Sequence, residues 1–574
     1  MIVPFWEKII ETKKCRTSGQ DFFVTDRDLE FYDKISPVFA CKKYPIPSPT
    51  LCPQERMKRR LAYRNQRHVY IRKSSYSAKT IFSMHSGDKT YPVYENEVYF
   101  SDLWDPKSFG YEYDFSRPFT EQMFAFINRV PHYARSITQL ENSDYCNNAN
   151  NLKDSYLSFN GGNSEKLLYT AMFKDCYECI DCLSVIACRS CFQCIECVNL
   201  EKSFYCQDCS RCTECLLCDW CSGCANCFSC TNLTNRQYYI ANKQYSKEWY
   251  FAVLKNLQIP DVIRDVRTWI SAQPKRYYKW LKNENVIGNN IINGKNIFHC
   301  FECSDCENLR YCDNIKTGKD CMDVSNFWWD PAWCYESCVV GHNANHILFS
   351  LDTYENVADV YYSFHCNRIH DCFCCTWLHS NEHHCVFNKP YSVQEYESLC
   401  GRIIEEMIAQ SVWWEFPNIE LSPWWYNETS AQEFFPETRE SVLVKWWKWK
   451  EEEPLLVNPK ITKPLHINQY NEKIVWYETA QKNIDDLLDS VIICDVTSRP
   501  FKVIKQELAF YIENSLPIPT KNPDQRHKER MNLRNPRTFL ERTCSECGTD
   551  IITTYTPEIS GKVLCEECYR KIVY

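Results

Sequence analysis

The residues of this sequence best suited to chemistry are four cysteines near its carboxyl end. They form two Cys-x-x-Cys pairs that are separated by the segment 548–564. Thiolates at this spacing can surround one metal ion tetrahedrally with little backbone strain, so the pattern predicts a structural zinc site. A disulfide or redox role for the same thiols stays open as the alternative. The four residues are Cys544, Cys547, Cys565 and Cys568.

Two other groups have metal-ligating side chains but no standard spacing. Three cysteines near the amino terminus could form a weak site: Cys15, Cys41 and Cys52. Ten histidines and cysteines fall between positions 365 and 385 and could bind one zinc ion. They are His365, Cys366, His370, Cys372, Cys374, Cys375, His379, His383, His384 and Cys385.

A stripe of cysteines occupies every third position from Cys176 to Cys230. Sixteen of these nineteen positions are cysteine, with Val185, Leu200 and Ser203 as the exceptions. A strand has period 2.0 and an α-helix period 3.6, so neither produces this stripe. It favours a solenoid of short strands, in which each coil stacks like residues about 4.8 Å above one another. A coil as long as the spacing from Val185 to Ser203 fits these gaps, although any multiple of three matches most of the cysteines.

The stripe thiols have three possible roles. They could be small buried residues in a narrow core, ligands of metal clusters, or partners in disulfides between coils. Downstream, only five cysteines keep the threefold register, which favours packing over an obligate cluster. These are Cys300, Cys303, Cys306, Cys312 and Cys321.

Two series of arginines are the candidate binding residues. Arginines spaced four apart share one face of a helix, and the basic stretch 56–73 could contact several phosphates. The sequence therefore predicts nucleic-acid binding, with RNA favoured, by the terminal regions. The alternative is that these arginines brace their modules through carboxylates and carbonyls. The residues are Arg56, Arg60, Arg64, Arg67, Arg72, Arg526, Arg530, Arg534, Arg537 and Arg542.

The two ends of the chain repeat one pattern. Both arginine series follow a Pro-Ile-Pro motif, and both have identical internal spacing. In this register Cys544 and Cys547 correspond to Ser74 and Ser77, whereas Cys565 and Cys568 correspond to Glu95 and Val98. A second repeat relates 227–250 to 372–396, through Cys-Phe-x-Cys-Thr-x-Leu and Asn-Lys-x-Tyr-Ser. We expect two duplicated modules and two tandem solenoids.

The front of each terminal module resembles a treble-clef-like domain described as a probable zinc ribbon, with the pattern C-x-x-C-G-x-x-F, D-x-x-F-Y and P-x-x-C-P-x-C-R. The first copy has Cys15, Ser18, Gly19, Phe22, Asp28, Phe31, Tyr32, Cys52, Pro53 and Arg56 at these positions, and two of the four expected ligands are replaced by Ser18 and Glu55. Through 114–119, 242–246 and 426–429 the whole chain resembles an uncharacterised cysteine-rich zinc-ribbon family of candidate-phyla bacteria. Some of its members carry a CaiB/BaiF label, which implies coenzyme A transfer; no residues here support that chemistry.

Composition bounds the remaining possibilities. The chain has 574 residues, 44% hydrophobic and 24% charged, which is typical of several globular domains. It has 38 cysteines, no apolar segment of membrane-spanning length and no leader-like start, so a reducing cytoplasm is expected. Its formal net charge of -8 gives no global attraction to nucleic acid. Glycine-rich phosphate loops are absent, which argues against a nucleotide cofactor.

The sequence thus predicts a mainly β, multidomain binding scaffold with at least one structural Zn²⁺ and no membrane partner. Its partner is nucleic acid or, alternatively, a protein; no catalytic residue is assigned, and a metal or thiol redox enzyme is the third possibility. We expect zinc-ribbon modules over 1–105 and 486–574, and solenoids over 142–250 and 283–396. The connecting parts are a helical connector over 106–141, a helical spacer over 251–282, a helical and Trp-rich segment over 397–450 and a linker over 451–485. Helices are expected at 115–129, 250–282 and 392–412.

Overall fold

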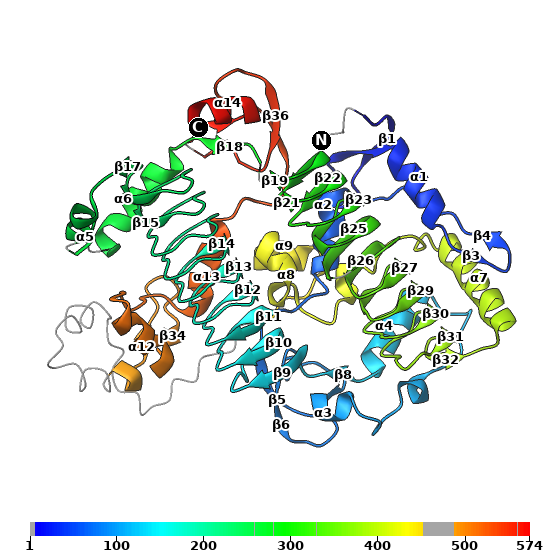
Figure 1. The fold of residues 1–574 in the computed structure, drawn as a ribbon. Helices are drawn as coiled ribbons and strands as arrows, with labels where there is room; N and C mark the ends of the chain where they lie inside the picture. Colours follow the sequence, from blue (N-terminus) through cyan, green and yellow to red (C-terminus); the bar gives the residue numbers. More distant parts are fainter. Residues whose placement is uncertain are drawn as a thin grey trace.

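Two stacks of short parallel strands dominate this computed structural model, which is mainly β (Figure 1). It describes residues 6–451 and 487–573, apart from 256, 258, 279, 329 and 560. The stacks lie side by side, and the two ends of the chain pack against them. Beyond Glu451, the predicted linker over 451–485 lies outside the described residues.

The first stack is a solenoid with a short coil. Asn147 pairs with Phe159, and Phe159 in turn pairs with Ala171, all in parallel register. Side chains that stack on one another lie 12 residues apart, which is the length of one coil. The predicted coil, as long as the spacing from Val185 to Ser203, is therefore wrong. The strands are β9 (Ile137–Glu141), β10 (Asn147–Lys153), β11 (Phe159–Glu165), β12 (Ala171–Lys174), β13 (Leu183–Ile186), β14 (Ile195–Val198), β15 (Ala225–Phe228), β16 (Gln237–Ile240) and β17 (Lys243–Gln244).

The short coil follows from a turn at every third residue. Asp175, Glu178 and Asp181 have φ near +54°, and each precedes an inward-pointing side chain. Four such triplets close one coil, so the chain bends four times per circuit and points every third side chain inward. The left-handed conformation is costly for most residues other than glycine, and least costly among those for asparagine and aspartate. That preference explains the asparagine-rich starts of both stacks.

Asparagines at these corners also form ladders along the stacks. The Asn148 amide donates to Asn160 at 2.8 Å, and the Asn151 amide donates to Asn163 at 3.1 Å. In the second stack Asn296 donates to Asn308 at 3.0 Å. Each ladder satisfies side-chain amides from coil to coil, and it thereby favours one register of stacking.

The interior of the first stack is a column of buried thiols. The cysteines from Cys176 to Cys230 are at most 3% exposed. A typical thiol, that of Cys182, lies 3.4 Å from the carbonyl of Ile180 and 3.6 Å from that of Cys191 in the next coil. All 38 cysteines are free thiols in the structure. Of the three roles open from the sequence, packing in a narrow core fits this geometry.

The second stack has the same parallel arrangement with a less regular coil. Stacked side chains lie 12 residues apart at Asn296 and 13 apart at Asn343. Isoleucine, valine and leucine share its interior with cysteine. Its strands are β20 (Glu284–Asn289), β21 (Ile291–Ile292), β22 (Lys295–Phe301), β23 (Glu307–Arg310), β24 (Asp313–Lys316), β25 (Lys319–Trp328), β26 (Tyr335–Val340), β27 (Ala344–Leu348), β28 (Leu351–Thr353), β29 (Val357–Tyr361), β30 (His370–Phe373), β31 (His383–Val386) and β32 (Lys389–Pro390).

Helices flank the stacks. The predicted helical segments 115–129 and 392–412 contain α4 (Phe119–Arg129) and α7 (Val393–Ala409). Ser392 caps α7 through a reciprocal contact with Glu395, the expected start signal for a helix. The predicted helix over 250–282 is instead α5 (Lys247–Lys255) and α6 (Ile259–Ser271), followed by β18 (Lys275–Arg276) and β19 (Trp280–Leu281).

The amino-terminal region joins small hairpins and helices. Its elements are β1 (Ile9–Lys14), β2 (Asp21–Thr25), α1 (Asp26–Ile35), β3 (Val38–Phe39), β4 (Lys42–Lys43), α2 (Pro53–Leu61), β5 (Tyr70–Lys73), β6 (Thr80–Ser83), β7 (Val93–Tyr94), α3 (Asn96–Tyr99), η1 (Pro106–Phe109) and β8 (His132–Tyr133).

The carboxyl-terminal region repeats much of this order. Between α7 and Glu451 lie η2 (Ile419–Leu421), η3 (Tyr426–Glu428), α8 (Ser430–Phe434) and α9 (Arg439–Val444). The elements after the undescribed residues are β33 (Ile492–Ile493), β34 (Pro500–Phe501), α12 (Lys505–Glu513), α13 (Pro523–Asn532), β35 (Leu540–Thr543), β36 (Asp550–Thr553), β37 (Val563–Leu564) and α14 (Glu566–Val573).

Candidate functional site

The four tail cysteines form a metal-capable cluster. Their four sulfur atoms all lie within 4.8 Å of one another. Cys544 and Cys547 occupy the turn between β35 and β36, where Gly548 adopts φ +74°. Cys565 and Cys568 come from the end of β37 and the first turn of α14. The sulfurs of Cys547 and Cys565 are 3.7 Å apart.

This geometry fits a tetrahedral ion. Zinc–sulfur bonds of about 2.3 Å place neighbouring sulfurs about 3.8 Å apart, and four thiolates suit zinc or iron. The backbone N–H of Cys565 donates to the Cys544 sulfur at 3.3 Å. Burial opposes ionisation of Cys544, but backbone N–H donors outweigh it and lower its pKa to about 6. The cluster could therefore hold one metal ion.

A hairpin at the other end of the chain makes the same backbone contacts without the thiols. Ser75 N–H donates to the Val93 carbonyl at 2.8 Å, as Ser545 donates to Val563 at 3.0 Å. The turn residue Ala78 even has φ +59° where the tail has Gly548. At the ligand positions, the Ser74 hydroxyl donates to the Glu95 carboxylate. A hydrogen bond thus joins the two segments that the tail cysteines could join through a metal.

The weak amino-terminal cysteine site is only half assembled. The Cys52 sulfur lies 3.8 Å from the Ser18 hydroxyl, and Cys15 is buried beside it. Cys41 is exposed at the turn between β3 and β4, and among the described residues these cysteines form no metal-capable group. The structure therefore does not bring Cys15, Cys41 and Cys52 together as the sequence predicted.

The histidine and cysteine concentration at 365–385 is divided by the wall of the second stack. Cys366, Cys372, Cys375 and Cys385 point into the core, where they pack with aliphatic side chains. Cys374 packs in a different, aromatic core. All the histidines lie outside the thiol core: His365 stacks on Trp377, and His370, His383 and His384 contact one another.

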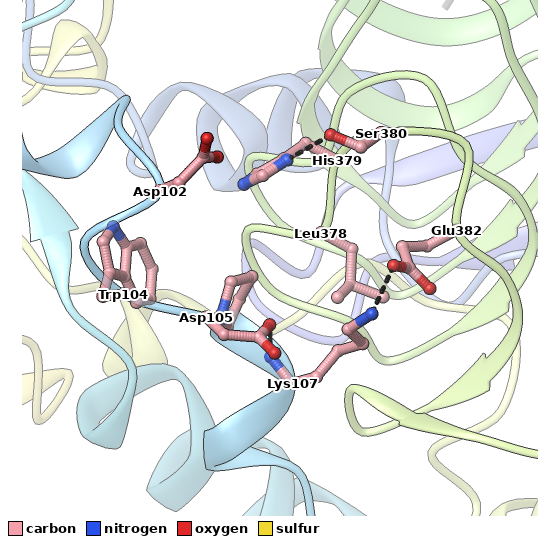
Figure 2. Close-up of a pocket in the computed structure, with 9 residues that line it drawn as sticks. Asp102, Trp104, Asp105, Lys107, Leu378, His379, Ser380 and Glu382 are labelled. Carbon is pink, nitrogen blue, oxygen red and sulfur yellow. Dashed lines mark hydrogen bonds and ion pairs between the residues drawn. The ribbon is translucent and has the colours of Figure 1, made fainter.

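His379 also lies outside, at a pocket of about 190 Å³ beside Trp104 and Lys107, where the Lys107 amine contacts Glu382 at 2.6 Å (Figure 2). The alternation of inward and outward side chains therefore separates the ten predicted ligands. They form no metal-capable group within the described part of the chain.

The amino-terminal arginine series forms a buried clamp on the second stack. Arg56 and Arg60 on α2 contact Asp323 on β25 at 2.8 and 3.1 Å. Arg60 also donates to the Tyr311 carbonyl at 3.4 Å. Both guanidinium groups are at most 2% exposed, and Asp323 is fully buried. Burial disfavours the Arg56 cation, but Asp323 and its neighbours hold the pKa of Arg56 well above its ordinary value.

The carboxyl-terminal series forms the same clamp on the first stack. Arg526 and Arg530 on α13 both contact Asp181, Arg530 at 2.7 Å. Arg530 donates to the Tyr169 carbonyl at 3.1 Å, and the Arg526 guanidinium lies 4.5 Å from the Tyr169 ring. In the amino-terminal clamp, Arg56 lies 5.1 Å from the Tyr311 ring. Each clamp therefore has two arginines, one aspartate and one tyrosine in matching places, and we call these groups the Asp323 clamp and the Asp181 clamp.

The other arginines of both series are also turned inward. Arg67 contacts Asp524 at 3.3 Å, and Arg537 contacts Asp313 at 2.7 Å. Arg72 and Arg542 donate to backbone carbonyls of their own hairpins. Arg534 contacts Glu196, and the half-buried Arg64 lies in a small cavity beside Asp352. None of the ten predicted residues is exposed, and nucleic-acid binding through them stays a prediction. The bracing alternative fits their contacts.

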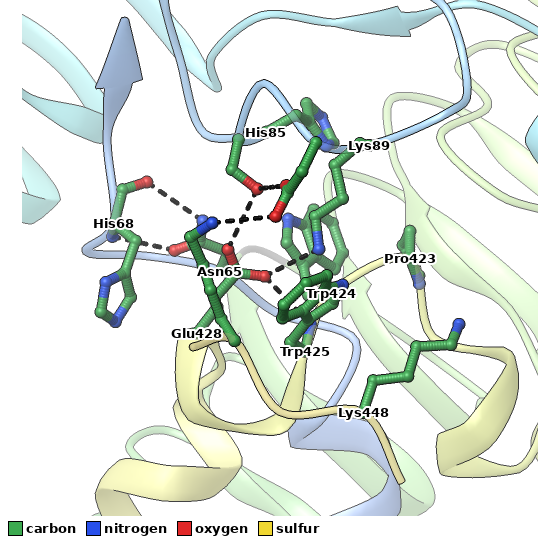
Figure 3. Close-up of polar contacts among 12 residues, drawn as sticks. Asn65, His68, His85, Lys89, Pro423, Trp424, Trp425, Glu428 and Lys448 are labelled. Atoms are coloured by element: carbon green, nitrogen blue, oxygen red, sulfur yellow. Dashed lines mark hydrogen bonds and ion pairs between the residues drawn. The ribbon is translucent and has the colours of Figure 1, made fainter. Parts of the chain in front are cut away.

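Sequence reasoning missed the acidic partners. Asp181 and Asp323 sit at left-handed corners of the stacks and are 0% exposed. The sequence did contain a signal for these two residues. Each aspartate comes one residue before an inward-pointing position, and aromatic residues occupy nearby outward-pointing positions. A third buried carboxylate, Glu428, was also missed: it accepts from Lys89 at 2.9 Å (Figure 3). It also accepts from the Tyr70 hydroxyl at 2.8 Å. It joins the segment before α8 to the amino-terminal hairpin.

Comparisons with known proteins identify no family for this chain. No family model matches the chain, and no curated protein matches it. A solved structure described as a "putative acetyltransferase" from Desulfovibrio desulfuricans G20 is 10% identical, with a TM-score of 0.10. The match covers 38% of this chain and 64% of that one. In the described residues no helix is both long and apolar enough to cross a membrane.

Proposed function

We propose that the protein is a binding scaffold for a protein partner, stabilised by one structural zinc ion. The observation that carries this proposal is a contrast in where the charges lie. Most arginines of both series make internal ion pairs or hydrogen bonds, whereas mixed charges remain on one side of the first stack. We call that side the ladder face. It consists of Lys166, Glu178, Arg189, Glu201, Lys202 and Glu214.

The charged residues of the ladder face lie on stacked coils, and their charges alternate in sign along the stack. Tyr177, Arg189 and Glu201 stack on consecutive coils through backbone bridges. Arg189 lies 5.1 Å from the Tyr177 ring, and Lys166 donates to the Tyr177 hydroxyl at 2.7 Å. Acidic residues lie between the cations along the stack, at Glu178, Glu201 and Glu214, so a phosphate backbone would meet repulsion. A protein surface of mixed charge complements this face better, because opposite charges can pair along its length.

Zinc is proposed on the chemistry of the donor set. Four thiolates at tetrahedral spacing and a closed, four-ligand site are typical of structural zinc. Free thiols throughout the chain suit a reducing compartment, so we place the protein in the cytoplasm.

We also propose that both ends are zinc-ribbon modules and that the two stacks are tandem repeats. This proposal is supported by the shared backbone contacts of the two hairpins and by the matching clamps. The amino-terminal module has replaced its ligands with the hydrogen bond between Ser74 and Glu95.

Quantitative affinity enrichment with in-cell crosslinking tests whether a protein partner binds the ladder face. A double variant, Arg189→Glu with Lys202→Glu, reverses charges on exposed residues of the ladder face. The matched control, Lys14→Glu with Lys34→Glu, reverses two lysines that lie on β1 and α1. We expect one protein that the wild type and the control enrich equally, that the ladder variant loses, and whose crosslinks map to this face.

Gel-shift titration with single-stranded RNA at two salt concentrations provides the opposing outcome. We expect no salt-dependent binding. RNA binding that the ladder variant weakens, or partners that the ladder variant keeps, would overturn the protein-scaffold proposal in favour of another class.

A further inference from the structure

A cavity of about 380 Å³ lies where three parts of the chain meet. The start of α2 supplies Gln54 and Met57, the second stack supplies His299 and Phe301, and the carboxyl-terminal module supplies Phe539. This volume is within the range of small-molecule sites, which are mostly apolar with a few placed polar groups. None of the contacts described above for the metal cluster or the ladder face uses it.

Aromatic rings form one part of the cavity wall. The Phe539 ring stacks on Phe301 at 4.8 Å between centroids with 22° between the planes. It also stacks on His299 at 4.9 Å and 30°. Tyr311 closes one side, and its ring stands edge-on to His299 at 6.0 Å. Stacked, nearly parallel rings favour a flat guest over a bulky aliphatic one.

One polar atom in this wall has no partner. His299 Nε2 is buried and makes no hydrogen bond within the structure. A buried polar atom without a partner loses its hydration without compensation, so such atoms call for an explanation. Burial lowers the pKa of His299 to about 3, which keeps the imidazole neutral at physiological pH. A neutral ring nitrogen can accept or donate one hydrogen bond to a guest.

The corresponding junction at the other end of the molecule is filled. There Asp524 and His527 on α13 stand where α2 has Gln54 and Met57, and Phe159 stands where the second stack has Phe301. Arg67 contacts Asp524 at 3.3 Å and lies 5.6 Å from the Phe159 ring. His527 contacts Glu433 at 3.2 Å. Ion pairs thus fill one junction, whereas aromatic rings surround a cavity at the other.

The charged residues of the lining limit the charge that a bound ligand can have. Arg537, its one arginine, already contacts Asp313 at 2.7 Å and Glu302 at 3.3 Å. Asp21 lies at the exposed side. A phosphate or carboxylate would therefore find no unpaired arginine among the lining residues.

We propose that this cavity is a binding site for a small, uncharged, planar heteroaromatic molecule, packed against the aromatic lining and hydrogen-bonded by His299. Gln54 and Thr538, which contact each other at 3.2 Å, lie in the same lining and offer further polar groups to the guest's edge. The proposal is independent of the protein partner proposed above.

Adenine is a suitable probe, because it is flat, uncharged and carries donors and acceptors. Titration calorimetry of the metal-loaded full chain with adenine should show one saturable site. Phe539→Ala removes stacking, and His299→Leu removes the ring nitrogen; each should weaken binding about tenfold, which corresponds to about 1.4 kcal/mol. The matched control is Val69→Ala, at the position that corresponds to Phe539 in the filled junction, and it should bind like the wild type.

A variant that fills the cavity keeps the proposal testable if Phe539→Ala or His299→Leu fails to fold. Gln54→Trp places a large ring at a half-buried lining position, and should abolish adenine binding while the urea midpoint stays unchanged. Cyclohexanol, which is neither flat nor aromatic, should not compete with adenine. Absence of saturation at about 1 mM adenine, equal binding by the Gln54→Trp variant, or competition by cyclohexanol would overturn the proposal.

Discussion

At the scale of single residues, two buried aspartates connect the stacks to the terminal modules. Asp323 and Asp181 are fully buried, and each receives two arginines from a helix distant in sequence. A buried ion pair adds little net stability compared with apolar packing, but removing one partner leaves a charge uncompensated. The clamps therefore fix where the terminal modules sit.

The Asp323→Asn and Asp181→Asn variants test this role. Each removes the nearest carboxylate of a buried arginine pair, and the remaining contacts with Glu336 or Glu507 are longer or reach one arginine only. We therefore expect a loss of about 3–5 kcal/mol in the free energy of unfolding, measured by urea denaturation. The control Glu30→Gln removes an exposed contact with Lys34 and should cost at most about 1 kcal/mol. A clamp variant as stable as that control would show that the clamps do not hold the modules.

The tail cysteines lead to a prediction of metal content. Native mass spectrometry should find one zinc ion per wild-type chain and none in the Cys568→Ser variant, because three thiolates bind the ion less tightly than four. Cys41→Ser changes an exposed thiol outside the cluster and should retain the ion. Four or more zinc ions per wild-type chain would mean that the thiols of the stacks bind metal as well.

At the scale of elements, the threefold stripe was sufficient to predict parallel coils with an inward thiol column. It could not set the coil length, because any multiple of three aligns most of the cysteines. What decides the length is the left-handed residue in each triplet, such as Glu178, which makes the chain turn four times in 12 residues. Backbone dihedral angles of this kind leave only a weak trace in sequence, through asparagine and aspartate.

The stacks should protect their thiols from alkylation. Cys41 and Cys547 are exposed, Cys565 is half-buried, and the other cysteines are buried. Burial also raises the pKa of Cys366 to about 12, so little reactive thiolate forms there. Maleimide labelling followed by mass spectrometry should modify one thiol in the zinc-bound protein, and up to two more after chelation. Labelling of several stack cysteines without denaturant would contradict the packed-core description.

The sequence was also sufficient to locate the four-cysteine cluster that could hold a metal ion, because each Cys-x-x-Cys pair brings two thiols together locally. The arginine series was equally regular, yet its regularity did not reveal its role. Whether Arg56 faces solvent or Asp323 depends on the docking of α2 against a strand far away in the chain. Long-range docking of this kind is set by tertiary packing, for which spacing within one helix gives no signal.

At the scale of the whole molecule, buried histidines at the module junctions make assembly sensitive to acid. Burial lowers the pKa of His527, between α13 and α8, to about 4. In the unfolded chain it titrates near 6.5, so between pH 6.5 and 4 the unfolded state binds a proton that the folded state does not. Stability is therefore lost as pH falls through this window.

The expected loss from His527 alone is about 3 kcal/mol between pH 7 and pH 4. Urea denaturation at successive pH values should show this slope, and His527→Gln should make it shallower. Burial also lowers the pKa of His132, to about 3, and its effect has the same sign. A His527→Gln variant with an unchanged pH slope would exclude this residue as a source of acid sensitivity.

The paths of the two clamps have a consequence for how the chain holds together. The amino-terminal module precedes the first stack in sequence but clamps the second, whereas the carboxyl-terminal module follows the second stack but clamps the first (Figure 1). Each half of the polypeptide thus packs its terminal module against the stack of the other half. This is the reciprocal exchange of a domain-swapped dimer, here fused into one chain. A single cut in the spacer between the stacks should consequently yield two fragments that stay associated until both clamps are broken.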